Sequence, residues 1–533
     1  MNRLLYRILP VLMLTGIVLP ACAVSIPFKP KPKPKPPVKV DLGLFEGQND
    51  VGDVHPAGTT QFDKNAKTYT LTSAGDNMWK TKDAFHFVWK KMAGDLSLSA
   101  DLQFPSPGGN AHRKAVLLIR QSLDADALYA DAALHGSGLT ALQFRPSAGA
   151  STADTELNFS TIAEAPSRLS LEKHGDLITM YIGKPGEPLH PAGASVRLHL
   201  DGSFYVGIGL CSHDPNIVEK AVFSNIDLHP LAEASADSGK TTLYSTLETI
   251  NLDAENRRAT VIYTKQGHFE APNWSRDGNS LVFDEGGQIM TVPADGKLPA
   301  KVKAIDIGLA SKCNGSHGFS PDGHQLAISC NMPDAPGSRV YYVPAAGGMP
   351  HMVTPNPSSY FHSWSPDGKT IAFTRPHPGG GDIFNIPASG GEEAALTSTV
   401  GISDDPDYSP DGEYIYFNSD RGGSMQIWRM RADGSQPEQI TSDEMNNWTP
   451  HPSPDGKWIV FLSYDKSVTG HPANKEISLR LMSLTDHKIT KLVDLLGGSG
   501  TINVPSWSPD SRSLAFVSYA LEPEASAATS PAK

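Results

Sequence analysis

Short stretches that alternate apolar and polar residues occur along most of the chain, and helical periodicity is scarce. In the first half the alternation is clear over residues 96–100, 142–144, 169–171, 205–210 and 221–228. A period of two places alternate side chains on opposite faces of a strand, so these stretches predict β-strands. We therefore expect an all-β chain in which residues 42–235 form a β-sandwich.

The second half is organised by a phrase of six residues that occurs six times. The copies begin at Asn273, Gly318, Ser363, Asp407, His451 and Ser506, and most contain Ser-Pro-Asp-Gly. Their aspartates are Asp277, Asp322, Asp367, Asp411, Asp455 and Asp510, at intervals of 45, 45, 44, 44 and 55 residues. This period is typical of one four-stranded propeller blade, with the phrase as the tight turn after its first strand. The repeats predict a six-bladed β-propeller over residues 240–519.

The order of strands within a blade also predicts how the ring closes. The later strands of one unit are expected at residues 370–374, 382–386 and 394–397, and those of the next at 414–418, 425–430 and 438–441. After the last copy only one strand follows, at residues 513–519, so that blade lacks two strands. Residues 247–252 and 259–264, upstream of the first copy, supply the missing pair. We expect both ends of the propeller to pair in one sheet, because closure removes exposed edges.

With these repeats the second half resembles the TolB-type propeller family over nearly all of residues 240–519. The resemblance implies the fold. It implies little about function, because the same phrase occurs in binding proteins, peptidase accessory domains and lyases.

The strand register predicts one disulfide. If Ser320 lies opposite His324 across the turn, Cys313 comes within one residue of facing Cys330. In an oxidising compartment we expect these two to be linked, the alternative being two free thiols. Cys211 is expected to be a buried apolar residue.

The first half contains phrases at residues 76–91 and 113–136 that look like concanavalin-like jelly-roll domains, which occur beside carbohydrate-active modules. The resemblance implies a jelly roll, and Trp79, Trp89 and Arg120 could then line a sugar-binding face. The alternative is that the tryptophans belong to the core, which is the commoner place for such residues.

Polar residues gather where the propeller channel should open, on the face opposite the repeated turns. His317 and His362 replace the proline that stands three residues before the motif serine in the other four copies. The same face should receive Glu270, Asn314, Asp404, Asp405, Asp407, His451 and His471. We expect a ligand site at this mouth.

Imidazoles and carboxylates together suit a divalent metal such as Mn, Zn or Ni, with His317, His362 and His451 as ligands. Such a metal could acidify a carbon beside a uronate carboxylate. The placement of His before the first strand is similar to that in oligogalacturonate lyases, although these have seven blades. The alternative is structural, since each histidine could instead donate to the backbone of a neighbouring blade.

The N-terminus predicts export. Residues 1–23 combine Arg3 and Arg7 with an apolar run too short to span a bilayer, as in a signal peptide. Two cleavage hypotheses remain open, one at Ala21-Cys22-Ala23 and one that makes Cys22 a lipidated anchor. Residues 24–41 contain a Lys-Pro repeat expected to be an extended linker, and 520–533 a disordered tail. We expect an extracytoplasmic and most plausibly periplasmic protein.

Composition and charge narrow the function. The net charge of -12 and the absence of a basic stripe exclude a nucleic-acid partner. GxSxG, P-loop, CxxC and HExxH motifs are absent. Our leading hypothesis is a protein that binds a polysaccharide or an envelope component. The alternatives are a metal-dependent polysaccharide lyase or related glycan-processing enzyme, and a docking scaffold for an envelope protein.

Overall fold

The computed structural model describes residues 40–231, 241–253, 258–310, 312–333, 335–398 and 400–523. Every regular element within these ranges is a strand, which confirms the all-β prediction. None of the described residues belongs to a helix long and apolar enough to cross a membrane. The predicted export signal, the Cys22 site and nearly all of the predicted linker lie outside the described residues.

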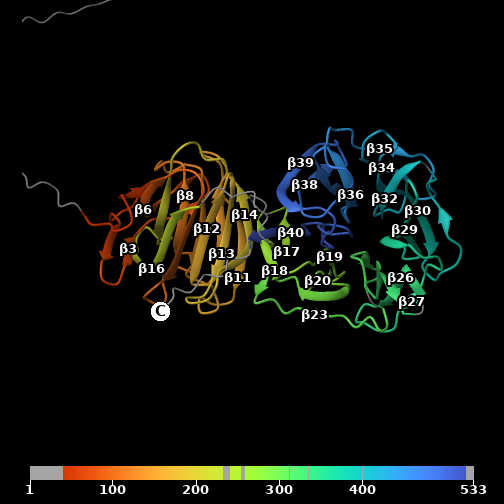
Figure 1. Ribbon diagram of the computed structural model, residues 1–533, viewed down its shortest axis with the longest axis horizontal. Helices are drawn as coiled ribbons and strands as arrows, with labels where there is room; N and C mark the ends of the chain where they lie inside the picture. The colour runs from red at the N-terminus through yellow and green to blue at the C-terminus, as the bar shows by residue number, and fades with distance from the viewer. Residues whose placement is uncertain are drawn as a thin grey trace, which may run out of the picture. The chain divides into compact units, whose positions relative to one another are not determined.

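Two antiparallel sheets make up the first half of the chain (Figure 1). One runs in the order β1 (Gly47–Val51), β6 (Phe85–Met92), β15 (Phe204–Cys211), β8 (Lys114–Arg120), β9 (Tyr129–His135), β10 (Thr140–Arg145) and β11 (Ala153–Phe159). Beyond β11 it continues, through a parallel pairing, into β18 (Ala259–Gln266), β17 (Thr241–Asn251) and β40 (Ser513–Pro523) of the second half. The other runs in the order β14 (His190–Arg197), β13 (Leu177–Gly183), β12 (Arg168–His174), β7 (Leu96–Gln103), β16 (Glu219–Pro230), β3 (Thr68–Ser73) and β2 (Thr59–Asp63). All five alternating stretches found in this half of the sequence lie within or across these strands.

A shared apolar core joins the two sheets. Leu117 and Ile119 of β8 meet Leu98 of β7 and Leu169 of β12 in one buried cluster. The alternate residues of β8 point to the outer face of their sheet, where a second cluster covers them. That cover includes Met78 of the short hairpin β4 (Met78–Trp79) and β5 (Lys82–Asp83). The central strands of this sheet are therefore buried on both faces.

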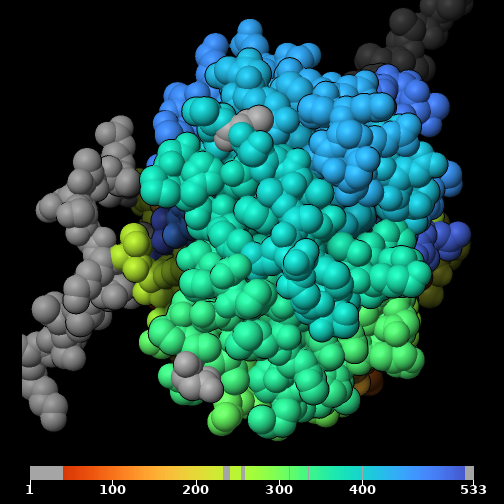
Figure 2. All heavy atoms as spheres, turned by 90° about the vertical axis from the view of Figure 1, so that its right-hand side faces the viewer, coloured from red at the N-terminus to blue at the C-terminus, as the bar shows by residue number. Residues whose placement is uncertain are grey.

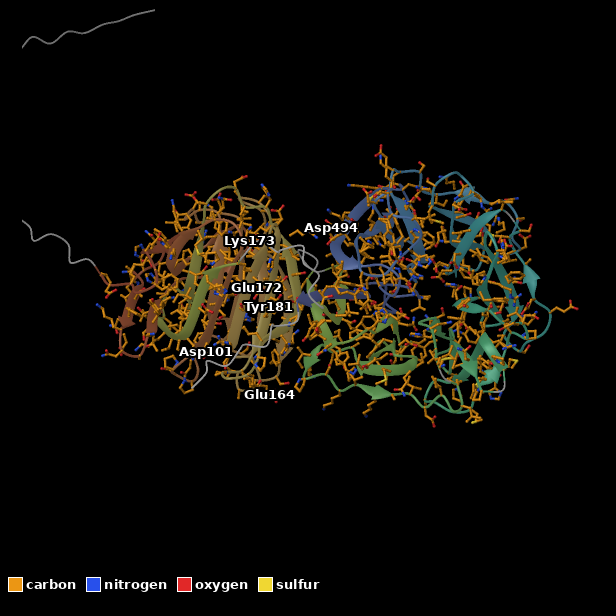
Figure 3. All side chains as sticks on the ribbon, viewed as in Figure 1. Asp101, Glu164, Glu172, Lys173, Tyr181 and Asp494 are labelled. Atoms are coloured by element: carbon orange, nitrogen blue, oxygen red, sulfur yellow. A yellow bond between two sulfur atoms is a disulfide. The ribbon has the colours of Figure 1, made fainter. Side chains whose placement is uncertain are left out.

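The outer face of the other sheet is more polar. Glu172 of β12 and Tyr181 of β13 lie close together there, as Figure 3 shows. The Tyr181 hydroxyl donates a hydrogen bond of 2.7 Å to the carboxylate of Glu522.

Most of the second half consists of successive groups of four strands, each with a copy of the repeated phrase between its first and second strands (Figure 1). The first group is β19 (Glu270–Trp274), β20 (Ser280–Glu285), β21 (Gln288–Pro293) and β23 (Lys303–Ala304), and the second is β24 (His317–Phe319), β25 (Gln325–Met332), β26 (Ala335–Pro344) and β27 (His351–Met352). The third is β28 (Tyr360–Trp364), β29 (Thr370–His377), β30 (Gly380–Pro387) and β31 (Ala394–Ala395), and the fourth is β32 (Gly401–Tyr408), β33 (Tyr414–Ser419), β34 (Gln426–Arg431) and β35 (Glu438–Gln439). The fifth is β36 (Asn446–Pro452), β37 (Trp458–Tyr464), β38 (Lys475–Ser483) and β39 (Ile489–Gly497). The face in Figure 2 is built largely from these residues, coloured green to blue.

The repeated phrase forms the turn that the sequence predicted. In the second copy Ser320 Oγ donates to Asp322 Oδ1 at 2.5 Å and accepts from the backbone N–H of Gln325 at 3.0 Å. Gly323 has a φ of +73°, a conformation that few residues other than glycine adopt readily. The phrase is thus a self-contained turn that needs no ligand.

The two ends of the propeller pair in one sheet, as predicted. Strand β17 (Thr241–Asn251) lies antiparallel to β40 (Ser513–Pro523) over its full 11 residues, and β18 (Ala259–Gln266) follows on its other side. A bridge between Trp507 and Leu514 adds the start of the last repeat. The predicted boundary at residue 519 was too early, because pairing with β17 extends β40 to Pro523.

The predicted disulfide between Cys313 and Cys330 is present, and Cys211 is free and buried as expected. The register behind that prediction was wrong by one residue, because His317 faces Ile328 and the turn is longer than assumed. The link still forms because Cys313 precedes β24 and is not held in the ladder. Its Cα lies 4.1 Å from that of Cys330.

Glu248 makes the closing sheet sensitive to pH. Its carboxylate is buried in β17 and accepts a hydrogen bond from Ser518 Oγ of β40. Burial raises the pKa of Glu248 to about 8. The protonated acid is therefore favoured in the folded state, and its stabilising contribution, complete below pH ~4.5, is lost as pH rises towards about 8.

We predict that Glu248→Gln, whose amide has the shape of the protonated acid but does not ionise, requires more urea to unfold than the wild type at pH 8. At pH 4.5 the two proteins should unfold at similar urea concentrations. The difference in the free energy of unfolding between the variant and the wild type should grow by roughly 1 kcal/mol per pH unit from pH 4.5 to pH 8. Urea unfolding across this pH range measures it. Glu444→Gln, at an exposed position, serves as a control, and its free energy of unfolding should vary with pH as that of the wild type does. The same pH dependence for Glu248→Gln would contradict the prediction.

Candidate functional site

The first strand of several blades carries a β-bulge just before the repeated phrase. The strand register shifts between Phe361 and Ser363 in β28, and comparable shifts occur in β19, β32 and β36. Asp405 and Thr449 adopt positive φ values of 53° and 51° at their bulges. A bulge turns a side chain away from the regular alternation of the strand. The bulges therefore direct polar groups of successive blades towards one end of the propeller.

These groups line a cavity of about 510 Å³, which we call the mouth pocket. Its lining comes from first strands, from the segments that precede them, and from the adjoining ends of second and third strands with the loops between them: Asn314, Ser316, Tyr360, His362, Thr374, Pro376, Gly380, Gly381, Ile402, Asp404, Asp405, Trp448, Thr449, Gly470, His471, Ser499 and Asn503. The prolines of the repeated turns line a different cavity, of about 230 Å³. The prediction that polar residues gather away from the turns agrees with this arrangement.

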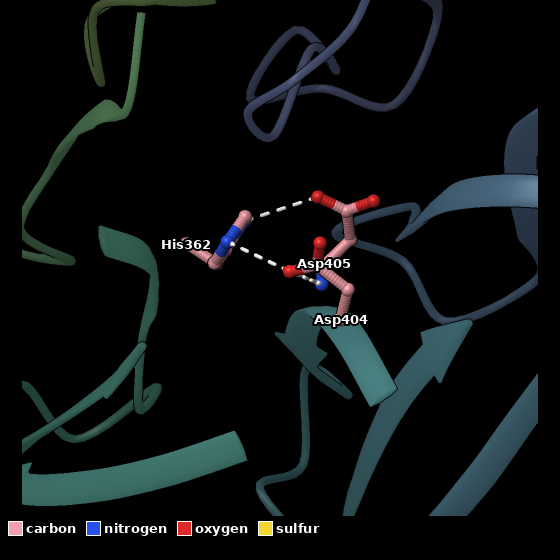
Figure 4. A group of neighbouring side chains, drawn as sticks. All are labelled: His362, Asp404 and Asp405. Atoms are coloured by element: carbon pink, nitrogen blue, oxygen red, sulfur yellow. Dashed lines mark hydrogen bonds and ion pairs between the residues drawn. The ribbon is translucent and has the colours of Figure 1, made fainter. Parts of the chain in front are cut away.

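His362, Asp404 and Asp405 form the tightest group in the mouth pocket (Figure 4). His362 lies on β28, and its Nε2 is 3.5 Å from Asp404 Oδ1 while its Nδ1 is 3.4 Å from Asp405 Oδ1. One potential ligand atom from each residue falls within 4.8 Å of the others. Among the described residues this is the one such group of three side chains that could hold a metal ion.

Burial perturbs the protonation of this group. It lowers the pKa of His362 to about 4, and the charge of Asp404 only partly opposes this. His362 is therefore neutral at pH 7, with a ring nitrogen able to act as a ligand. Burial, and then the negative charge of Asp404, raise the pKa of Asp405. A cation bound here would relieve the repulsion between the two carboxylates.

Several other buried polar atoms of the lining have no hydrogen-bond partner among the described residues. They are Asn314 Oδ1, Thr374 Oγ1, Thr449 Oγ1 and Trp448 Nε1. A buried polar group without a partner costs about 1–3 kcal/mol. Their convergence on one cavity indicates a surface built for a polar ligand rather than for stability.

The three predicted metal-binding histidines do not converge. His451 is held by Asp407 Oδ2 at 3.0 Å from its Nδ1 and by the Ile502 carbonyl at 2.6 Å from its Nε2, so both nitrogens are engaged. His317 is fully buried against the backbone of Ala271 and Val282, and burial lowers its pKa to about 4. His451 fits the structural alternative. His317 does not line the mouth pocket, and neither of its ring nitrogens has a hydrogen-bond partner among the described residues. Only His362 lies in the metal-competent group.

Of the other residues predicted to lie at the mouth, four line the mouth pocket and Glu270 does not. Asn314, Asp404, Asp405 and His471 line the mouth pocket, where the His471 ring lies 4.5 Å from that of Trp448. Glu270 does not line it. This side chain faces Asp284 across the β19–β20 pair, and burial, then the charge of Asp284, raise its pKa to about 7.

In the sandwich, neither predicted tryptophan joins the central core. Trp79 and Trp89 are both half-buried on the outer face of their sheet, and the indole of Trp89 donates to Asn49 Oδ1 at 2.9 Å. Arg120 cannot line a sugar-binding face, because it is fully buried and bonded to the Ser122 and Asp124 carbonyls.

Sequence reasoning missed part of the mouth pocket. The missed residues are Ser316, Tyr360, Thr374, Trp448, Thr449, Ser499 and Asn503. Thr449 stands before Pro450 just as Asp405 stands before Pro406, so alignment of the repeats could have found it. Asn503 stands five residues before Ser508 just as Asp404 stands five before Ser409, so the same alignment could have found it. Ser499 lies in an irregular segment further from the last copy of the phrase.

Comparisons with known proteins agree with the observed propeller. Residues 362–520 match the model of the TolB beta propeller domain. An uncharacterized protein of Agrobacterium fabrum is 42% identical over 275 residues, which cover 52% of this chain and 92% of that protein. The solved structure of a protein provisionally assigned as TolB from Agrobacterium tumefaciens is 41% identical with a TM-score of 0.50, covering 52% of this chain and 99% of its own. TolB from Acinetobacter baumannii is similar at 19% identity and a TM-score of 0.34, over 48% of this chain and 65% of its own.

We predict that His451→Ala is much more destabilising than His362→Ala. Loss of the His451 ring leaves the buried Asp407 carboxylate and the Ile502 carbonyl without their partner, at a cost of about 2–4 kcal/mol. His362 makes no comparable hydrogen bond and borders a cavity, so its loss should cost about 1 kcal/mol or less. Urea unfolding of both variants measures the difference. Equal destabilisation would show that His362 is also structural.

Proposed function

Because the chain belongs to the TolB-like β-propeller family, we propose that it is an exported binding protein that takes a glycan or an envelope component at the mouth pocket. The propeller in this proposal is a six-bladed ring, with the sheet of β40, β17 and β18 as its sixth blade. The observation that carries the proposal is the convergence of buried, unpartnered polar side chains on one cavity.

The lining of the mouth pocket supports a hydroxyl-rich ligand. Asn314 Oδ1 and the Asp404 and Asp405 carboxylates are acceptors, whereas the Thr449 hydroxyl and the Trp448 indole N–H can donate. A volume of about 510 Å³ lies within the usual range of about 300–1,000 Å³ for small-molecule sites. One or two sugar rings, or a polar group of an envelope polymer, would fit these properties.

Export to the periplasm remains part of the proposal. It is supported by the predicted signal peptide at residues 1–23 and by the TolB-like propeller, while Cys22 is proposed as an alternative lipid anchor. The N-terminal sandwich, proposed as a concanavalin-like jelly roll, would contact glycan through its outer face, where Trp79 and Trp89 are half-buried.

We expect the purified protein to bind at least one member of an array of peptidoglycan fragments and bacterial polysaccharides. Thr449→Val should weaken binding to that glycan about tenfold, because it removes one hydroxyl that could bond to a ligand. Its folding free energy should not fall, since Thr449 Oγ1 has no partner among the described residues. Titration calorimetry and urea unfolding measure the two effects.

The exposed Thr485→Val is the matched control and should bind as the wild type does. Binding by no glycan, or equal binding by Thr449→Val and the wild type, would sink the assignment of a glycan to the mouth pocket.

A second candidate function is a metal-dependent polysaccharide lyase at the same pocket. The observation that favours it is the group of His362, Asp404 and Asp405, a neutral imidazole with two carboxylates. These residues would hold Mn, Zn or Ni, and the metal would supply charge neutralisation beside a substrate carboxylate.

This candidate predicts that apo protein binds one divalent ion per chain, measured by calorimetry with Mn²⁺, Zn²⁺ and Ni²⁺ in turn. His362→Ala and Asp404→Asn should each weaken the binding at least tenfold. His351→Ala, which removes an exposed histidine from β27, is the control. Binding of none of the three ions, or binding that survives both substitutions, would eliminate the metal-dependent reaction.

A further inference from the structure

A second polar cavity lies on the outer face of the sandwich sheet that contains β8–β11. We call it the sandwich pocket. Its volume is about 210 Å³, and its lining is Asn77, Trp79, His112, Lys114, His135, Leu139, Gln143, Asp154, Glu156, His213 and Arg258. Except for Trp79, none of these residues was singled out by the sequence.

Polar residues form a row across this face. Gln143 of β10 stands opposite Asp131 of β9 and Asp154 of β11 in the strand register. All three are at most 5% exposed, yet Gln143 Oε1 and both carboxylate oxygens of Asp131 have no hydrogen-bond partner among the described residues. Gln143 lines the cavity, and because an unsatisfied buried polar atom is unfavourable in a folded protein, its position there favours a ligand-binding role.

Two cations, Lys114 and Arg258, line the pocket and contact other groups of the protein. Lys114 is buried and donates from Nζ to Asn77 Oδ1 at 3.0 Å and to the Met78 carbonyl at 2.9 Å. Arg258 lies beside β11 because β18 pairs with that strand, and it contacts Asp154 Oδ1 and Glu156 Oε1 at 3.2 Å each. Arg258 is thus paired with carboxylates, whereas the groups bonded to Lys114 carry no net charge.

Burial also shifts the protonation of several acidic and imidazole groups of the lining. Burial, and then the charge of Glu156, raise the pKa of Asp154 to about 7, and burial raises that of Glu156. Burial lowers the pKa of His135 and of His213, so these rings are uncharged at pH 7. These residues do not form one of the metal-competent groups of the described chain.

Trp79 adds the apolar part of the lining. Lys114 Nζ and Arg258 Cζ lie 5.5 and 5.7 Å from the centroid of its ring, which holds the indole in place at the edge of the cavity. An indole with surrounding amide, imidazole and carboxyl groups offers one apolar surface and many hydrogen-bond donors and acceptors.

We propose that the sandwich pocket binds a single uncharged sugar ring, whose hydroxyl groups bond to Gln143, Asp154 and Glu156 while Trp79 contacts its apolar face. The acidic side chains of Asp154 and Glu156 in the lining disfavour an anion, the polar lining disfavours a hydrocarbon, and the volume is below that of sites for larger molecules. The inference rests on the proposed glycan-binding role of the sandwich and assigns it a site and a ligand class.

The test uses the full chain with glucose, galactose, mannose and N-acetylglucosamine as probes, followed by saturation-transfer NMR and titration calorimetry. At least one sugar should bind, and Gln143→Leu should raise its dissociation constant at least tenfold. Because Gln143 Oε1 has no partner among the described residues, this variant should fold with undiminished stability in urea. A structural role for Gln143 would instead lower the stability.

Two further variants separate this site from the mouth pocket. Gln61→Leu removes an exposed glutamine of β2 on the other sheet and should bind the sugar as the wild type does. Thr449→Val should also leave monosaccharide binding unchanged. If Thr449→Val abolishes sugar binding and Gln143→Leu does not, the sugar belongs to the mouth pocket and the sandwich site is refuted while the proposed function stands. Binding of inorganic phosphate in place of all four sugars, or of no probe, also overturns the inference.

Discussion

The pairing of β17 with β40 is the constraint on which the propeller depends. These strands come from opposite ends of the propeller sequence, and 11 residues of β17 lie in the ladder that joins them. Without it, the first strands of the last repeat would have no partners and two sheet edges would be open to solvent. Ring closure also determines the relative positions of the first strands, because neighbouring blades pack against each other around the channel. The mouth pocket can therefore collect residues that are far apart in sequence.

The structure separates the residues that build the ring from those that suit a ligand. In the repeated turn, serine, aspartate and glycine satisfy one another, so the motif completes its own hydrogen bonds. The bulges at the opposite ends of the first strands do not complete their own hydrogen bonds in this way. They place Asp405 and Thr449 in uncommon backbone conformations and leave polar atoms without partners. The motif that identifies the fold is thus distinct from the residues that carry the candidate chemistry.

Buried polar groups have two different meanings in this molecule. His451 is satisfied on both ring nitrogens, and Arg145 pairs with Asp83 at 2.7 Å with further bonds to carbonyl groups. Such groups stabilise the interior. Gln143 and Thr449 are equally buried but lack partners among the described residues, and both border cavities. Hydrogen-bond satisfaction, more than burial or residue type, separates structural from candidate ligand-binding residues.

Local patterns in the sequence were enough to predict the all-β class, the strands of the blades, the ring closure and the Cys313–Cys330 link. Each depends on a period, a turn motif or a short separation within one hairpin, and these survive in the linear chain. The sites depended on tertiary structure. His317 and His362 occupy the same position in the repeats and His451 the next one, but the repeats do not show that His451 meets Ile502 while His362 meets two carboxylates of the next blade. Arg258 reaches Asp154 only because β18 pairs with β11. Contacts between distant segments decide which polar groups are satisfied, and no local pattern encodes them.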